Sequence, residues 1–341
     1  MKRLISLFAV LACMAVGYAQ SSLVATLNHG EAVSVYYGYG ALAEAYEAAT
    51  HGDVITLSSG MFKSVDIAKN ITVRGAGAGA TDDCTRLDGQ FYIYGVPDSV
   101  SGHLTLEGLY NDDYVYCGNY SDATDIKNAH FIKCRFSCVF SNMAVKMLNA
   151  MFIQCKISTQ ICLNMAGDKA NFFNCYLMSP SFSSDNSSFH TFNNCVLIGD
   201  CSSWHNSLFT NCILWDTYSL RIPSSSQASY CLGMNSSPDN YNMFEKLYPY
   251  NQYEMVGTSD ADLKTIFKTF TGTYSDTETF ELTDEAKAKY VGTDGREVGI
   301  YGGNFPFTFK SDLPKITKFN VASQSTEDGK LKVEIEVSGV E

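Results

Sequence analysis

Residues 170–177 read Ala-Asn-Phe-Phe-Asn-Cys-Tyr-Leu, and this octet is one of five similar copies between residues 128 and 214. The other copies occupy residues 129–136, 150–157, 190–197 and 207–214. The cysteines of successive copies are 21, 20, 20 and 17 residues apart, and Cys231 follows 19 residues later in a degraded sixth copy. A fixed period near 20 residues predicts a solenoid, in which each unit buries its apolar side only against its neighbours.

The spacing within one copy predicts two short strands joined by a corner. Ala170 and Phe172 lie two apart, as do Cys175 and Leu177, so each pair can point to one face of a strand. Phe172 and Cys175 lie three apart, so both can point inward only if the chain turns between them. Asparagine suits such a corner because it tolerates the left-handed backbone conformation. The residues at this position are Lys133, Gln154, Asn174, Asn194 and Asn211.

This pattern describes the coils of a parallel β-helix, because the leucine frame of leucine-rich repeats and the period of helical repeats are absent. We therefore predict an all-β chain with about eight to ten coils. The coil should be right-handed, following the usual chirality of parallel crossovers. The phenylalanines and cysteines of the copies should form two internal stacks, with equivalent positions about 4.8 Å apart.

The first nineteen residues are typical of a secretory signal peptide. Lys2 and Arg3 precede the apolar run 4–16, and Gly17-Tyr-Ala19 forms a small-x-small cleavage site. Cys13 faintly resembles a lipoprotein processing position, but the apolar run continues past it and favours plain export. We expect a periplasmic, outer-surface or extracellular protein.

The charge of the mature chain excludes some partners. Removing residues 1–19 takes two cations from the net charge of −12, which leaves 22 basic against 36 acidic residues, or −14. Such a charge argues against nucleic acid and against unaided binding to polyanions. No other segment approaches the roughly 18 apolar residues that span a bilayer, so we expect no transmembrane segment in the mature chain.

The mature chain keeps eleven of the twelve cysteines, an odd number. Six of them fall on the repeat, where cysteine acts as a small apolar filler. Stacked strands hold their side chains parallel, which suits disulfide torsions poorly, so we predict reduced packing cysteines. Zinc is not expected, because Cys134 and Cys138 have no matching second pair.

Motifs at the start of the chain carry a family resemblance. Residues 39–49 have helical apolar spacing, residues 52–57 read Gly-Asp-Val-Ile-Thr-Leu, and residues 71–75 read Ile-Thr-Val-Arg-Gly. Here the chain resembles secreted bacterial right-handed parallel β-helix proteins of the pectin-lyase-like superfamily. The resemblance implies that residues 39–49 form a cap helix over the first coil.

The end of the chain differs in composition. Residues 282–290 predict a short helix capped by Thr283. Residues 292–303 resemble the closure that covers the last coil in many of these proteins. Residues 314–321 and 330–337 alternate as two strands around Asp328-Gly329. We expect a signal peptide at 1–19, a capped β-helix at 20–303 and a small β appendage at 304–341.

The fold hosts lyases, hydrolases, adhesins and inert spikes, so it does not settle the function. The Asn-Thr-Asp and Gly-His-Gly motifs of the superfamily's polygalacturonases are absent, and Pro223 follows Arg221-Ile222 where Lys is expected. The lyase motifs are also missing. The carboxylates of the repeat region drift against the coil period and predict no stacked pair: Asp168, Asp185, Asp200 and Asp216. His190 falls on an inward position, which favours an interior residue over a catalytic base.

A binding site is predicted within residues 110–120, where aromatic rings alternate with paired carboxylates. Sugars dock their apolar faces on such rings while polar neighbours bind the hydroxyls. The candidate ligand-binding residues are Tyr110, Asp112, Asp113, Tyr114, Tyr116 and Tyr120. Asp112 and Asp113 could instead hold a calcium ion, although no cofactor is expected. A second tyrosine cluster comprises Tyr241, Tyr248, Tyr250 and Tyr253. The alternative for both is that tyrosine is simply frequent on such β surfaces.

The sequence favours an exported, non-catalytic β-helix protein that associates with glycans or with a surface. The expected partner is a polysaccharide or a host or cell-surface glycan, and a monomer is expected. The alternative is a polysaccharide lyase or glycoside hydrolase acting on plant or host glycans. An enzyme should gather two carboxylates, or a carboxylate and a basic residue, in one groove of an outer sheet face.

Overall fold

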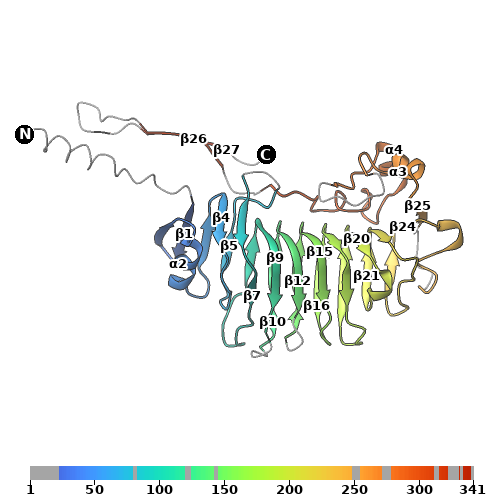
Figure 1. The fold of residues 1–341 in the computed structure, drawn as a ribbon, viewed down its shortest axis with the longest axis horizontal. Coiled ribbons are helices and arrows are strands. Elements are labelled where there is room, and N and C mark those ends of the chain that lie inside the picture. Colours follow the sequence, from blue (N-terminus) through green and yellow to red (C-terminus); the bar gives the residue numbers. More distant parts are fainter. Residues whose placement is uncertain are drawn as a thin grey trace, which may run out of the picture.

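The computed structural model describes residues 23–79, 83–119, 124–141, 145–247, 254–270, 278–310, 315–321, 330 and 333–338. The predicted signal peptide, residues 1–19, therefore lies outside the described residues. The chain forms a parallel β-solenoid of about nine turns, confirming the predicted architecture. The strands follow one another side by side along the long axis, from the blue N-terminal end to the yellow C-terminal end (Figure 1). Right-handedness stays a prediction.

Two long sheets build the solenoid. Sheet A has eleven strands in the order β2 (Ala32–Tyr37), β1 (Val24–His29), β3 (Val54–Leu57), β5 (Thr72–Arg74), β8 (Thr105–Glu107), β11 (His130–Ile132), β14 (Ala150–Ile153), β16 (Lys169–Phe173), β19 (Phe189–Asn193), β21 (Ser207–Thr210) and β23 (Gln227–Ser229).

Sheet B has twelve strands. Its main path runs through β4 (Gly60–Lys63), β6 (Thr85–Asp88), β9 (Leu109–Cys117), β12 (Arg135–Ser141), β15 (Lys156–Leu163), β17 (Tyr176–Met178), β20 (Val196–Gly199), β22 (Ile213–Asp216), β24 (Leu232–Asn235) and β25 (Glu254–Gly257). β7 (Phe91–Ile93) pairs with β9, and β18 (Pro180–Phe182) pairs with β15. On the third side, β10 (Ile126–Lys127) pairs with β13 (Met147–Leu148).

The predicted corners between sheets A and B are confirmed by the backbone. The residue before each repeat cysteine has a positive φ, a conformation that costs most L-residues energy. The φ values are 52° at Lys133, 54° at Gln154, 51° at Asn174, 54° at Asn194, 57° at Asn211 and 51° at Tyr230. A left-handed residue therefore turns the chain from a strand of sheet A to one of sheet B.

The interior holds the two predicted stacks. The five repeat phenylalanines are fully buried, and neighbouring ring centroids lie 4.5, 4.8, 4.7 and 5.0 Å apart from Phe131 to Phe209. The repeat cysteines are also buried, and their thiols donate to backbone carbonyls, as Cys175 does to Phe152 at 3.3 Å. All eleven cysteines among the described residues are free thiols.

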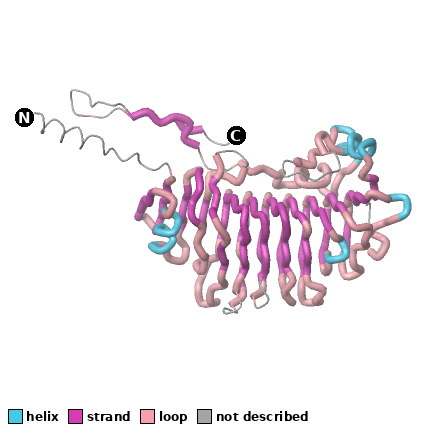
Figure 2. The backbone as a smooth tube through the Cα atoms, in the orientation of Figure 1, coloured by secondary structure: helices cyan, strands magenta, loops and turns pink. Residues whose placement is uncertain are grey.

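Helix α2 (Ala41–Ala48) lies at the N-terminal end, as predicted for residues 39–49. It buries Ala41, Leu42 and Ala45 and packs against β1 to β4. The three α-helices of the described residues lie at the two ends of the molecule (Figure 2, cyan, where the short 3₁₀ helices Cys201–Ser203 and Pro238–Asn240 are cyan too). α2 thus covers the first coil with apolar side chains that the open end of the solenoid would otherwise expose.

The C-terminal helices build a second core against the outer face of sheet B. α3 (Asp260–Ile266) and α4 (Asp284–Lys289) bring Leu263, Ile266 and Ala286 against the exterior of β17 to β24. α4 begins at Thr283, whose hydroxyl accepts a hydrogen bond from Ala286 N at 3.2 Å, as predicted. Residues 241–247 pack into the main core beside Cys231 and cover the last coil.

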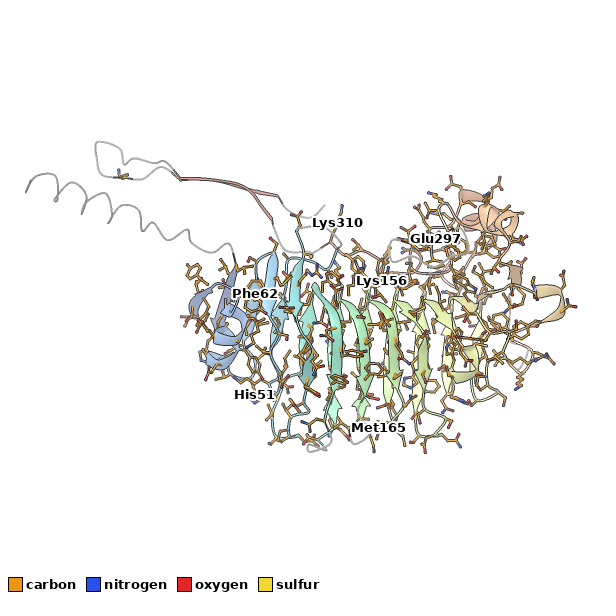
Figure 3. The ribbon with its side chains drawn as sticks, viewed as in Figure 1. His51, Phe62, Lys156, Met165, Glu297 and Lys310 are labelled. Atoms are coloured by element: carbon orange, nitrogen blue, oxygen red, sulfur yellow. The ribbon has the colours of Figure 1, made fainter. Side chains whose placement is uncertain are left out.

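The segment 291–310, here called the strap, runs back along the corners of the solenoid. Its backbone binds the corner side chains: Asn211 contacts Thr293, Asn194 contacts Glu297, Asn174 contacts Ile300 and Gly302, and Gln154 contacts Pro306. Lys310 reaches Gly77 in an antiparallel bridge. In Figure 3 Glu297, Lys156 and Lys310 lie along this same edge. The sequence led us to expect that this segment covers the last coil. It lies instead along the side of several coils and holds their corners.

Two strands follow the strap, as predicted for the end of the chain. β26 (Lys315–Val321) and β27 (Val333–Ser338) form an antiparallel pair, and the turn at Asp328-Gly329 lies outside the described residues. Among the described residues, no helix is long and apolar enough to cross a bilayer.

Candidate functional site

The predicted binding residues lie on the outer face of sheet B, around strand β9. The alternation of β9 points Leu109, Asn111, Val115 and Cys117 into the core. Tyr110, Tyr114 and Tyr116 therefore point outward, as the sequence predicted. Strands β6 and β7 lie on one side of β9 and β12 on the other, so four strands contribute to this surface.

A β-bulge divides β9 into two halves. Asn111 pairs with Phe136 and Tyr114 pairs with Cys138, so Asp112 and Asp113 face only one residue of β12. The buried Asn111 side chain holds the bend, donating to Leu87 O and Gly89 O at 2.9 Å and accepting from Asp113 N at 3.0 Å. Bulges re-aim side chains, and here the bulge separates a charged half of the surface from an aromatic half.

The aromatic half gathers five rings, here called the aromatic patch: Tyr92, Tyr94, Tyr114, Tyr116 and Phe140. Tyr92 stacks on Tyr116 at 5.0 Å, and Tyr114 lies 5.7 Å from both Tyr116 and Phe140. All of these ring pairs are within 27° of parallel. Tyr114 is 43% exposed, and the other four side chains are partly buried.

This geometry determines what the patch can bind. Rings that stack on one another share part of their faces, so most of the free surface consists of ring edges, hydroxyls and the outer faces of the end rings. Tyr114, the most exposed ring, offers the largest free apolar area. Such a surface can take the apolar face of a sugar ring on one side and bind its hydroxyls through the phenols and Asn119, whose amide donates to the Tyr94 hydroxyl at 3.1 Å.

The charged half is a row of three cations and two tyrosines on adjacent strands. The register places the row in the order Arg86, Tyr110, Arg135, Lys156 and Tyr176. Arg86 and Arg135 sandwich the Tyr110 ring at 4.7 and 4.5 Å, and Lys156 lies 4.9 Å from the Tyr176 ring. Cation–π attraction of this kind holds each cation against the face of the neighbouring tyrosine ring. Both faces of Tyr110 are therefore occupied, so it cannot serve as a sugar platform.

Lys156 is a buried cation that the sequence did not single out. Burial and the neighbouring Arg135 charge lower its pKa to about 8, while Glu278 acts in the opposite direction. It lies where the row meets the C-terminal second core. Lys156 packs on Tyr176, the last member of the row, and therefore has a structural role at that junction.

A small groove of about 160 Å³ lies beside the row. Its charged lining residues are Arg86, Asp88, Asp112 and Asp113. Arg86 forms an ion pair with Asp112, and the two side chains are 42% and 53% exposed. Asp113 accepts a hydrogen bond from Tyr114 N at 2.9 Å. The groove thus gathers three carboxylates and one arginine on an outer sheet face, in a solvated setting.

The predicted residues are thus only partly brought together. Tyr114 and Tyr116 join the aromatic patch, while Tyr110 and Asp112 belong to the charged half. Tyr120 lies outside the described residues. Tyr92, Tyr94 and Phe140 were not predicted, because they come from other coils. The signal that could have found them is the coil period, which places Tyr92 and Phe140 24 residues before and after Tyr116.

Three further expectations concern residues away from this surface. Tyr241, in the second tyrosine cluster, was proposed as a surface ring, but it is buried in the C-terminal cap with its hydroxyl 3.8 Å from the Cys201 sulfur. Tyr248, Tyr250 and Tyr253 of that cluster lie outside the described residues. His190 is fully buried inside the solenoid, as predicted. Within the described residues no group of three or more His, Cys, Asp or Glu side chains could hold a metal ion, and calcium at Asp112 and Asp113 stays a hypothesis.

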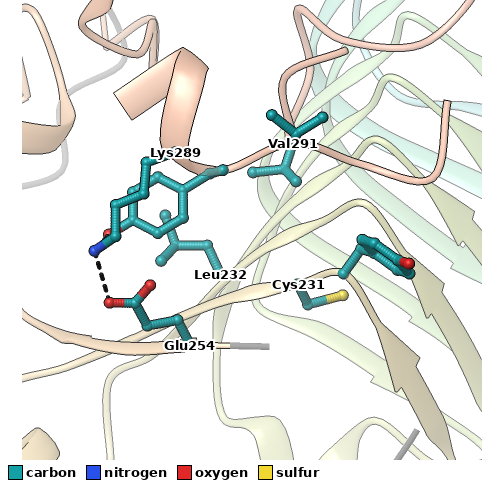
Figure 4. A pocket seen from close by; sticks show the side chains of 8 residues that line it. Cys231, Leu232, Glu254, Lys289 and Val291 are labelled. Carbon is teal, nitrogen blue, oxygen red and sulfur yellow. Dashed lines mark hydrogen bonds and ion pairs between the residues drawn. The ribbon is translucent and has the colours of Figure 1, made fainter. Parts of the chain in front are cut away.

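A second pocket, of about 270 Å³, lies between the last coil and the C-terminal helices (Figure 4). Cys231 and Leu232 line it from the solenoid, and Lys289 and Glu254 close it with an ion pair at 2.8 Å. The Lys289 amine also lies 3.1 Å from the Tyr290 hydroxyl. This ion pair is half exposed and joins α4 to β25, so it holds the C-terminal helices in place.

No family model, no curated protein and no solved structure matches this chain.

Proposed function

We propose that this chain is an exported β-helix protein of the pectin-lyase-like type that binds a glycan without cleaving it. The observation that carries the proposal is the aromatic patch on sheet B, where five rings from three coils lie on one partly exposed surface. Stacked aromatic residues with phenol and amide groups at their rim are the chemistry by which proteins bind neutral sugars.

The charge of the chain favours a neutral glycan. The net charge of −12 disfavours the binding of polyanions. Arg86, the cation that lines the groove, is already paired with Asp112. The polar groups beside the aromatic patch are carboxylates, phenols and an amide. These groups accept or donate hydrogen bonds to hydroxyls and would repel uronic acids.

A lyase or hydrolase is the second candidate function, because the groove gathers Asp88, Asp112 and Asp113 with Arg86. Catalytic carboxylates usually need a desolvated setting that shifts one of them towards the protonated form. Asp112 is instead half exposed and tied to an arginine. For this reason we place binding ahead of catalysis.

A panel of neutral and acidic polysaccharides, read for binding by calorimetry and for new reducing ends or unsaturated products, tests the proposal. We expect binding to a neutral glycan with no product. Replacing Tyr114 and Tyr116 by Ala should weaken it at least about tenfold, since loss of two stacking rings removes over ~1.4 kcal/mol. Tyr218→Ala is the matched control, because Tyr218 is 69% exposed and lies far from the patch.

Two outcomes would contradict the proposal. Equal binding by the double variant and the wild type would place the glycan elsewhere. Product release that is abolished by Asp112→Asn or Arg86→Ala, with the fold intact, would establish the enzymatic alternative instead.

A further inference from the structure

The first strand of sheet A is an unprotected edge. β2 forms one end of the sheet, and among the described strands only β1 pairs with it. Its sequence, Ala-Val-Ser-Val-Tyr-Tyr, carries no charge, in a chain with 60 Asp, Glu, Lys and Arg residues. Val33 is 61% exposed, Val35 45% and Tyr37 48%. These three side chains point to the same face because they alternate along the strand.

The register shows which backbone groups of β2 point away from the sheet. Gly38 N donates to Leu23 O, continuing the antiparallel ladder in which Tyr37 faces Val24. In such a ladder every second residue bonds to the neighbouring strand. The even-numbered residues of β2 therefore bond to β1, and Val33, Val35 and Tyr37 direct their N–H and C=O groups outward.

β2 lacks the features that usually block an edge. Proteins protect edge strands with lysine, proline, bulges or an overlying segment. β2 has no charge and no proline, and its six residue pairs with β1 run without a register shift. Helix α2 packs on the apolar, core-facing side of β1 and β2, because Tyr36 on that side joins the core. The outer side stays exposed.

We propose that β2 pairs antiparallel with β2 of a second copy of this chain, with Val35 on the two-fold axis. This register places Val33 opposite Tyr37 and Val35 opposite Val35, all of them residues whose backbone groups point outward. Pairs of β-branched and aromatic side chains are among the stabilising cross-strand pairs. Sheet A would then run without a break from one solenoid into the next, end to end.

The register itself favours a second copy, because Val33, Val35 and Tyr37 complement the same three residues about a two-fold axis. Two copies of a chain with net charge −12 repel each other, and the uncharged β2 lets them meet where no like charges face. Glu31, the nearest charged residue to the strand, falls opposite Tyr39 of the other copy. The closed two-fold contact uses the same strand from both copies and leaves no free β2 edge for a third.

Sedimentation velocity of the full chain over a wide dilution series tests this pairing. We expect a monomer–dimer equilibrium in place of the monomer expected from the sequence. Val35→Lys places two like charges opposite each other and should raise the dissociation constant at least about tenfold. Tyr218→Lys is the matched control on a remote exposed residue and should leave the equilibrium unchanged.

A mixing experiment separates pairing from misfolding. Val35→Lys and Val35→Glu should each be monomeric alone and should associate when mixed, because opposite charges then meet on the two-fold axis. A wild type that stays monomeric at every concentration would overturn the proposal. A dimer that survives Val35→Lys would also overturn it. A dimer that is lost only when residues 311–341 are removed would show that the C-terminal strands make the contact instead.

Discussion

Phe172 lies at the centre of the phenylalanine stack, with Phe152 4.8 Å away on one side and Phe192 4.7 Å away on the other. Its ring is fully buried and its nearest neighbours belong to other coils. In a solenoid each coil is stabilised only by the coils beside it, so a cavity here weakens two interfaces at once.

Replacing Phe172 by Ala should lower the free energy of unfolding by about 3–5 kcal/mol, since the ring leaves a cavity that the fixed coil spacing cannot close. Chemical denaturation measures this loss. Phe189→Ala is the control, because Phe189 lies on the adjacent strand but is 47% exposed and should cost far less. Equal costs for the two variants would contradict the assigned inward and outward faces.

His190 occupies the inward position that holds Ala170 and Ser207 in the neighbouring coils. Neither ring nitrogen has a hydrogen-bond partner among the described residues, and burial lowers its pKa to about 3. The unfolded chain binds a proton near pH 6.5, so the folded state should lose about 1.4 kcal/mol for each pH unit below ~6.5.

Asp168 has the opposite effect. Burial raises its pKa to about 6, against hydrogen bonds from Met147 N and Met165 N, so its contribution to stability grows as the pH falls from about 6 towards 4. Comparing His190→Ser with the wild type isolates the histidine. Between pH 6.5 and 4.5 the melting temperature of the wild type should fall relative to that of the variant, because the Asp168 contribution is common to both and only the wild type must keep His190 uncharged. Parallel pH profiles would contradict a neutral, buried His190.

At the scale of elements, the corner residues bind the strap as well as turning the chain. Asn174 shows both roles: its backbone has a φ of 51°, and its amide donates to Ile300 O at 2.8 Å and to Gly302 O at 2.7 Å. An asparagine side chain is short enough to reach a backbone that runs directly over the corner. The strap needs glycine there too, because a Cβ on Gly302 would lie 1.7 Å from Glu297 O.

Two substitutions separate these roles. Asn174→Gly keeps the left-handed backbone but removes both hydrogen bonds, and should destabilise the protein by about 1–3 kcal/mol. Asn174→Ala should cost about 1 kcal/mol more, since alanine disfavours that backbone. Both variants should make residues 291–310 more sensitive to protease. Unchanged proteolysis would show that the amide does not hold the strap.

At the scale of the whole molecule, the cysteines are spread along the solenoid axis instead of pairing across it. The thiols of the repeat cysteines donate to carbonyls of an adjacent coil, so they are satisfied without disulfides. Most are completely buried, and burial raises the pKa of Cys134 well above its ordinary value. Buried neutral thiols react slowly with oxidants.

Unfolding the protein with an alkylating agent and no reductant should therefore label most of its cysteines. Mass spectrometry counts the labels, and the same experiment on the folded protein should label mainly Cys162, which is less buried than the others. Five intramolecular disulfides would contradict this expectation and would assign the chain to disulfide-stabilised proteins.

The sequence by itself determined the inside of this protein. The interior of a solenoid makes the same demand on every coil, so Phe172, Cys175 and the corner residue Asn174 recur with the coil period. The cap helix and the helix after Thr283 could also be predicted from the sequence, because apolar spacing and capping are local signals.

Only the tertiary structure decided the outside. Tyr92, Tyr116 and Phe140 meet because their coils happen to place them in register, and solvent imposes no repeated chemistry that would mark such residues. The bulge at Asp112 and Asp113 separates Tyr110 in the charged row from Tyr114 in the patch, which two-residue alternation alone could not foresee. The path of the strap depends on contacts between residues more than 80 positions apart, so no local pattern encodes it.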